Sequence, residues 1–361
     1  MNTISSEAAG SRRTSVVANS LAQHSVLNPT LVWAALGAFF IVLQIYVFGS
    51  WIAGGGAKPI VPNPADVPDY TRYACLVFQI FGVGACIAGA IYVIRRSIKE
   101  GRLSFDAMLF IGGALAGWAD PISNFIRPQF FGSSAMVNLQ SWGPYIPGWL
   151  APRAEHYAEP ILLTAPFGYS QVFLWVPIVA CLLMQWARRR WPNANVLRYV
   201  LVAWVFCGVS LLLEELVMNR LGVQAYPGSE RSLAIWSGET YQYPIYNPIL
   251  WGAVWVATAA LRFFRDDRGR SVVERGADEL QMSESTRTTV RLLAVTGFIN
   301  VLLIGYGLAL AFVNLVSPNV QTPSGYASHL HNYMCGEGTP MACPGPSVPI
   351  PIRGSQMIPP G

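Results

Sequence analysis

Seven long apolar stretches constrain this chain more than any other feature of its sequence. A transmembrane helix needs about 20 mostly apolar residues. The stretches that reach this length lie at about 30–53, 72–94, 105–126, 167–187, 197–218, 245–264 and 291–316. The chain is 53% hydrophobic and only 12% charged, whereas a soluble domain is roughly 25% charged. The sequence therefore predicts an all-α polytopic membrane protein, a bundle of about seven transmembrane helices.

Basic residues are unevenly distributed between the two sides of the predicted bundle. The second, fourth and sixth stretches end in "RRSIKEGR", "RRRW" and "RFFRDDRGR", on the same side as the N-terminus. Most of the 24 basic residues fall on that side, although the segments on the other side are longer. Because cytoplasmic loops carry the excess of Lys and Arg, we predict a cytoplasmic N-terminus and an extracytoplasmic C-terminus. We therefore predict a multi-pass protein of the cell inner (plasma) membrane.

Three segments fall outside the apolar stretches. Residues 1–28 contain no apolar signal-peptide core and are predicted to be a disordered cytoplasmic tail. Residues 29–316 are predicted to form the transmembrane domain. Residues 317–361 are predicted to form a Pro/Gly-rich extracytoplasmic tail. The connection at about 127–165 is rich in aromatic residues. It predicts an extracytoplasmic lid loop, with a belt of interfacial aromatic residues as the alternative.

The six cysteines divide into two groups. Four lie within apolar stretches and are predicted to be buried packing residues: Cys75, Cys86, Cys181 and Cys207. The other two, Cys335 and Cys343, lie in the extracytoplasmic tail, where an oxidising exterior permits a disulfide between them. Two free thiols are the alternative for that pair.

The residue pattern gives no indication of a metal or a cofactor. No histidine and no lysine lies within an apolar stretch, which excludes haem ligation between helices and a retinal Schiff base. His329 and His331, taken with the tail cysteines, fit no standard zinc spacing. The net charge of +5 comes from short arginine clusters beside apolar runs and does not indicate nucleic acid. We predict no metal and no cofactor, and we expect the lipid bilayer and a lipophilic small molecule as partners.

Two carboxylates interrupt the apolar stretches at similar depth. "GWADPISN" (117–124) places Asp120 about 22 Å from the cytoplasmic start of the third stretch, at 1.5 Å per residue. "EELVMN" (214–219) places Glu215 about 25 Å from the start of the fifth. A carboxylate in hydrocarbon is costly and usually functional. We therefore predict that Asp120 and Glu215 share a pocket in the outer half of the bundle, with a structural polar network as the alternative.

Other polar residues fall near this level. Asn124 and Asn219 each follow an acid by four residues, which on an α-helix places them on the same face. Glu214 is about 100° around the helix from Glu215; we favour Glu215 as the inward residue and keep Glu214 as the alternative catalytic group. With the two asparagines, the candidate substrate-binding residues are Tyr169, Gln171, Tyr246, Asn247 and His156.

The third stretch contains residues that shape the helix around Asp120. Gly113 and Gly117 form a GxxxG pair, which lets a neighbouring backbone approach closely. Pro121 removes one backbone hydrogen bond and predicts a kink beside Asp120. The kink frees a carbonyl near residue 117, which then needs a hydrogen-bond partner.

Seven spans with "GWADPISN" in the third and "EELVMN" in the fifth resemble the AveC-type spirocyclase family of actinobacterial membrane proteins. The resemblance covers roughly residues 30–335. It implies a role in secondary metabolism, because the family's best-known member, in avermectin biosynthesis, closes a dihydroxy-ketone polyketide into a spiroketal and also dehydrates it. It carries over no catalytic residue.

The predicted pair of acids suits this chemistry. Two carboxyl groups in one apolar cavity favour a protonated partner, which can act as a general acid while the other stabilises a cation. We therefore predict an enzyme of the cyclase or dehydratase type, with Asp120 and Glu215 as catalytic residues. A proton-coupled transporter and an accessory membrane protein are the alternatives. A transporter needs polar access from both sides, and the cytoplasmic half of the spans has few polar residues.

Overall fold

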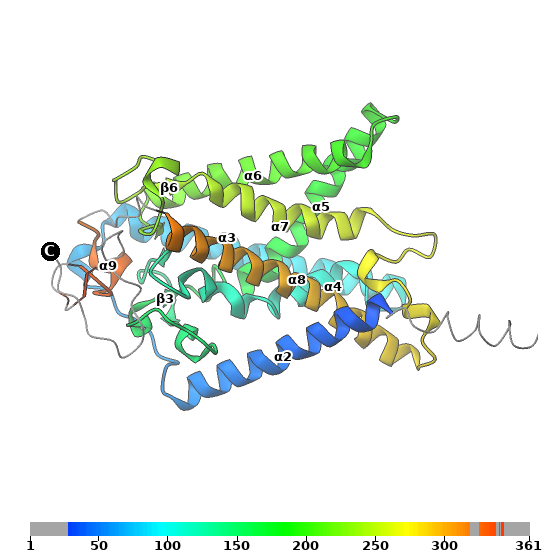
Figure 1. The fold of residues 1–361 in the computed structure, drawn as a ribbon, viewed down its shortest axis with the longest axis horizontal. Coiled ribbons are helices and arrows are strands. Elements are labelled where there is room, and N and C mark those ends of the chain that lie inside the picture. The colour runs from blue at the N-terminus through cyan, green and yellow to red at the C-terminus, as the bar shows by residue number, and fades with distance from the viewer. Residues whose placement is uncertain (1–27, 318–324, 337–338, 340, 343–361) are drawn as a thin grey trace, which may run out of the picture.

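The protein is described by a computed structural model that covers residues 28–317, 325–336, 339 and 341–342. The described part is predominantly helical. Its long helices run side by side along the long axis of the molecule, and the strands and α9 gather at one end of them (Figure 1). The other end carries the turn between α3 and α4 and the connection between α7 and α8 (Figure 1).

The elements follow one another in a simple order. The α-helices are α2 (Pro29–Ala53), α3 (Asp69–Glu100), α4 (Phe105–Ala114), α5 (Phe167–Arg190), α6 (Val196–Arg220), α7 (Tyr246–Phe263), α8 (Glu284–Val316) and α9 (Ser328–His331). Six two-residue strands pair antiparallel: β1 (Phe131–Gly132) with β4 (Gln224–Ala225), β2 (Leu139–Gln140) with β3 (Ala158–Glu159), and β5 (Ala234–Ile235) with β6 (Tyr243–Pro244). These strands join loops to one another and do not form a layer of their own.

Five helices are long and apolar enough to cross a membrane: α2, α3, α5, α6 and α8. They correspond to five of the seven predicted stretches. For these five, the prediction of a long apolar helix is confirmed. The sixth stretch forms α7, which has only 18 residues. Ten residues of α7 are buried, where it packs against α5, α6 and α8. This helix therefore lies inside the bundle.

The third predicted helix, 105–126, is not continuous, and that part of the prediction is wrong. α4 ends at Ala114, and the chain goes on as a 3-10 helix, η2 (Gly117–Asn124), that contains Pro121. Pro121 has no N–H and its ring clashes with the preceding turn of an α-helix, so the helix gives way before it. The break leaves the carbonyl of Trp118 free, and it accepts a hydrogen bond of 2.7 Å from the indole of Trp142.

The predicted close approach at Gly113 and Gly117 is confirmed. A Cβ added at Gly113 would lie 2.5 Å from the carbonyl oxygen of Tyr169. A Cβ at Gly117 would lie 2.7 Å from the Cβ of Ala165. The two glycines thus bring the end of α4 and the beginning of η2 against the beginning of α5.

The connection 127–165 folds against one end of the bundle. It supplies β1, β2 and β3, and Trp142, Trp149 and Tyr157 within it are buried. The ring of Trp142 packs edge to face on Phe48 of α2, with centroids 5.2 Å apart. These aromatic side chains therefore contribute to the core.

The cysteine predictions have different outcomes. The four cysteines within the helices are buried and free, as predicted: Cys75, Cys86, Cys181 and Cys207. Cys335 is buried as well. Its predicted disulfide partner, Cys343, lies outside the described residues, as do the tails 1–27 and 343–361.

The pairing of α2 with α8 gives a first prediction. A Cβ at Gly37 would lie 2.0 Å from the carbonyl oxygen of Leu293, whereas a Cβ at Gly49, on the same helix, meets nothing within 4 Å. Gly37→Ala should therefore destabilise the protein by roughly 1–3 kcal/mol through overpacking, and Gly49→Ala should not. Thermal unfolding of the two variants in detergent is the measurement. Equal unfolding temperatures would contradict the close contact of these helices.

Candidate active site

A cavity of about 150 Å³ lies where η2, α5, α6, α7 and α8 meet. Its walls are mostly apolar and include Leu211, Met218, Trp251, Trp255 and Leu310. The cavity lies toward the end of the bundle that carries the strands. The polar side chains that reach this space interact more strongly with one another and with a bound molecule than they would in water, because the apolar walls lower the local dielectric constant.

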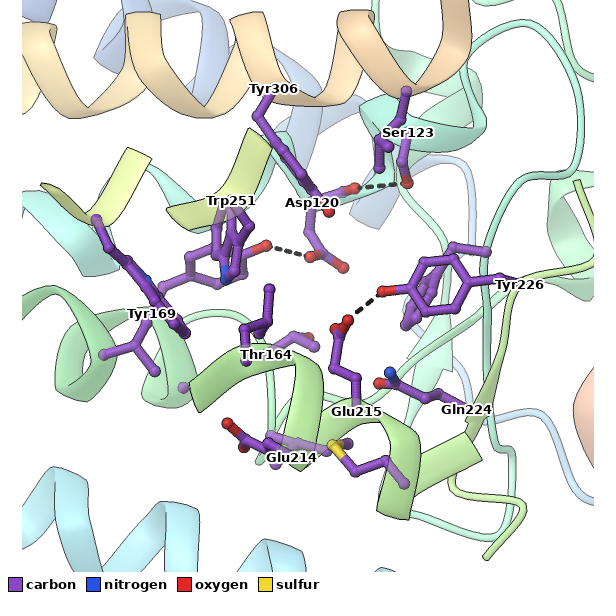
Figure 2. Close-up of a pocket in the computed structure, with 18 of the residues that line it drawn as sticks. Asp120, Ser123, Thr164, Tyr169, Glu214, Glu215, Gln224, Tyr226, Trp251 and Tyr306 are labelled. Atoms are coloured by element: carbon purple, nitrogen blue, oxygen red, sulfur yellow. Dashed lines mark hydrogen bonds between the residues drawn. The ribbon is translucent and has the colours of Figure 1, made fainter. Parts of the chain in front are cut away.

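Asp120 enters the cavity from η2. The hydroxyl of Tyr169 donates a hydrogen bond to Oδ1 of Asp120 (Figure 2). The two residues meet because Gly117, one turn before Asp120, lies against Ala165, just before α5. The close contact at Gly117 therefore places Tyr169 next to the carboxyl group of Asp120.

Glu159 is the second partner of Asp120, and it was not predicted. A hydrogen bond joins the two side chains, and Glu159 is only 4% exposed. It lies in β3, where pairing with β2 brings it near Ser141. Burial, followed by the neighbouring charge of Asp120, raises the pKa of Glu159 well above its ordinary range. Glu159 therefore favours its protonated form at a pH where an exposed glutamate is ionised.

Glu215 enters the cavity from α6. Its Oε1 accepts a hydrogen bond of 2.8 Å from the hydroxyl of Tyr226, and its Oε2 accepts one of 2.6 Å from Nδ2 of Asn247. The hydroxyl of Tyr306 donates to Oδ1 of Asn247 at 2.6 Å. This chain of contacts joins α6, α7 and α8 around one carboxyl group.

The two predicted catalytic acids face the same space. Figure 2 shows the carboxyl groups of Asp120 and Glu215 directed toward each other from opposite walls. Glu214 points away from them in the same view. Its side chain is exposed although it also lines the cavity. Glu215 is therefore the inward acid, and Glu214 lies at the mouth of the cavity.

The predicted binding residues fall into two groups. Tyr169 and Gln171 line the cavity. Asn247 is fully buried and reaches it through Glu215. Asn124, Asn219, Tyr246 and His156 are not among the lining residues.

Asn124 was expected on the same face as Asp120. Both residues line a small second cavity, but Asn124 is not among the residues that line the cavity between Asp120 and Glu215. In the 3-10 helix η2, with three residues per turn, a residue four positions on is displaced by about 120°. Asn124 instead accepts hydrogen bonds from the backbone N–H groups of Gln129 (2.7 Å) and Phe130 (2.9 Å). It thereby fixes the turn that places Phe130 in the cavity wall.

The remaining predicted residues hold loops in place. Nδ2 of Asn219 donates to the carbonyl oxygen of Gln242 at 3.0 Å. Nδ1 of His156 lies 2.6 Å from the carbonyl oxygen of Asn332. The hydroxyl of Tyr246 accepts from a backbone N–H at 3.4 Å. Each of these side chains connects two backbone segments outside the cavity lining.

Tyr306 and Tyr226 were also missed. Tyr306 lies 15 residues after Arg291, the start of the seventh stretch, so the helical rise places it about 22 Å deep. The depth count that located Asp120 would have found it. Tyr226 follows α6 in a loop, where depth cannot be counted from the sequence.

The groups in this cavity are carboxyls, phenols and amides. They can donate, accept and exchange protons with an uncharged oxygen-bearing molecule. Among the described residues, no three His, Cys, Asp or Glu side chains are placed to hold a metal ion.

The fold and the site define a helical membrane protein with two carboxyl groups facing each other in an apolar cavity. The family model described as "Spirocyclase AveC-like" matches residues 100–330, a range that includes all the residues lining the cavity. The chain belongs to this AveC-like spirocyclase family. No curated protein and no solved structure shows detectable similarity to the chain.

The raised pKa of Glu159 gives a second prediction. The folded chain binds this proton more tightly than the unfolded chain, so the stabilising contribution is complete below about pH 4.3, the ordinary value, and is lost as pH rises toward the folded pKa. Glu159→Gln keeps a hydrogen-bond donor but does not titrate. The unfolding temperature of the wild type should therefore fall more steeply from pH 5 to 9 than that of the variant. Glu239→Gln, at an exposed position with no ion pair among the described residues, should keep the wild-type slope; equal slopes in all three proteins would contradict the assignment.

Proposed function

We propose that the chain is a membrane enzyme that closes a lipophilic hydroxy-ketone of polyketide type into a cyclic ketal, such as a spiroketal, or dehydrates it by acid catalysis. The observation that carries this proposal is the position of Asp120 and Glu215 on opposite walls of one apolar cavity. Family membership supports a cyclase-type role. No cofactor takes part in the proposed reaction.

The Asp120–Glu159 pair is the proposed proton donor. The pair shares one proton, and Asp120, the member that lines the cavity, donates it to the hydroxyl oxygen of a hemiketal. The protonated hydroxyl leaves as water, and the carbon–oxygen bond electrons leave with it. The substrate becomes an oxocarbenium ion, and the carboxyl pair is left with one more negative charge beside that cation.

Glu215 is the proposed acceptor. Both of its oxygens accept hydrogen bonds, from Tyr226 and Asn247, and this fixes the direction of the carboxyl group. A second hydroxyl of the substrate attacks the cationic carbon, a new carbon–oxygen bond forms, and its proton passes to Glu215. If a neighbouring C–H proton is lost instead, the same acceptor yields the dehydrated product. The proton returns from Glu215 to the Asp120–Glu159 pair before the next turnover, so the cycle consumes no net proton.

The cavity dimensions suit the reacting centre of a larger molecule. A volume of about 150 Å³ holds a ring-sized part of a substrate and little water. Excluding water favours closure because bulk water favours the open hydroxy-ketone. Gln171 of α5 is partly exposed and Glu214 of α6 is exposed, and both line the cavity. We propose that the cavity opens between these two helices and that the rest of a lipophilic substrate extends from it into the bilayer.

The proposed topology adds two crossings to the five apolar helices. In it α4 with η2, and α7, also cross, so the chain passes the membrane seven times with the N-terminus cytoplasmic and the C-terminus extracytoplasmic. The cavity then lies in the outer half of a plasma membrane. A disulfide between Cys335 and Cys343 would form on that same oxidising side.

Substitution of the two acids tests the proposal. Asp120→Asn and Glu215→Gln should each lower the conversion of a dihydroxy-ketone by purified protein by roughly 10²–10⁴-fold, the usual contribution of a general acid or base. Glu214→Gln is the matched control, because it removes an adjacent carboxyl group that points away from Asp120, and it should lower conversion far less than either of these substitutions. Thermal unfolding is measured alongside. Folded Asp120→Asn and Glu215→Gln proteins with wild-type conversion would contradict the proposal.

A further inference from the structure

A second cavity lies at the opposite end of the bundle from the paired acids. It has a volume of about 370 Å³ and lies among the ends of α3 and α7, the beginning of α4 and the beginning of α8. The side chains that line it include five arginines: Arg96, Arg102, Arg262, Arg265 and Arg291. The site is independent of the proposed catalytic cavity.

Buried carboxylates neutralise only part of this positive charge. Asp106, which is 2% exposed, pairs with Arg96 and with Arg262, the latter at 2.8 Å. Glu274, which is fully buried, pairs with Arg265 at 2.9 Å and Arg291 at 2.7 Å. With Glu100, which pairs with Arg96 at 2.9 Å, three carboxylates face five guanidinium groups. The cluster therefore keeps an excess of two positive charges.

Two arginines keep unused donors. Arg102 is exposed, and its side chain has no hydrogen-bond or ion-pair partner among the described residues. Arg291 is only 4% exposed, and its Nη1 is unpartnered within the described part of the chain. A buried guanidinium nitrogen without an acceptor is costly, and an anion in the adjacent cavity would supply one after a small movement of the side chain.

Arg265 lies close to two other positively charged side chains, Arg262 and Arg291. Its guanidinium lies 3.5 Å from the centroid of the Phe105 ring. Burial lowers the pKa of Arg265 below its ordinary value, and the charges of Arg262 and Arg291 add to this, although Glu274 and Asp106 act in the opposite direction. An anion bound in this cavity would relieve the repulsion among the three arginines.

We propose that this arginine-lined cavity binds a phosphate-type anion, supplied either by the headgroup of an anionic phospholipid or by free phosphate. Guanidinium groups match the oxygen geometry of phosphate and can bind it through two parallel hydrogen bonds. The apolar side chain of Leu103 and the ring of Phe105 line the same space and offer contact to the glycerol or acyl part of a lipid. In the proposed topology the cavity lies at the cytoplasmic surface, at the level of the inner-leaflet phosphates.

Binding is measured on the delipidated full-length protein. One arm measures the unfolding temperature in detergent with increasing sodium phosphate, against sodium chloride at equal ionic strength. The other arm measures retention of phosphatidylglycerol and of phosphatidylcholine by native mass spectrometry. We expect stabilisation by phosphate, selective retention of phosphatidylglycerol, or both; the first indicates a soluble anion and the second a lipid headgroup.

Charge reversal at Arg102 links the binding to this cavity. Arg102→Glu removes no contact that the fold depends on and should weaken the binding roughly tenfold, the loss expected for a charge-assisted hydrogen bond. Arg189→Glu is the matched control, because Arg189 is exposed near the end of α5 and does not line the cavity. It should bind like the wild type. Absence of binding in both arms, or equal weakening by the two variants, would overturn the proposal.

Discussion

A carboxyl group can remain inside an apolar helix bundle only if polar partners replace the water that it loses. In this protein the partners come from different elements of the chain. Tyr169 of α5 bonds to Asp120 of η2, and Asn247 of α7 links Glu215 of α6 to Tyr306 of α8. The hydrogen bonds that stabilise the two carboxyl groups therefore also hold the walls of the cavity together. Loss of one such contact is expected to affect both stability and the geometry of the site.

The two ends of the bundle carry polar clusters of opposite character. At one end, carboxyl groups from η2, β3 and α6 meet in or beside a small apolar cavity. At the other end, arginines from α3, α7 and α8 surround a larger cavity with buried counter-charges. The helical segments between them are packed with apolar side chains. This separation places the proposed anion site away from the proposed catalytic acids.

Apolar length in the sequence was enough to find the long helices, and counting helical rise was enough to place Asp120 and Glu215 at one depth. That count assumes a regular α-helix. The chain around Pro121 is a 3-10 helix, so a spacing of four residues does not place Asn124 directly above Asp120. Glu159 could not be found in this way. Its position depends on a two-residue strand pairing within 127–165, and so short a strand leaves no periodic signal in the sequence.

We propose that a ketal-forming substrate reacts between Asp120 and Glu215. The most direct measurement is an experimental structure of the protein in nanodiscs with a simple spiroketal bound. We expect ligand density in the cavity, with the ketal oxygens within hydrogen-bond distance of both carboxyl groups. Density in another part of the bundle, with the space between Asp120 and Glu215 filled by protein side chains, would contradict it.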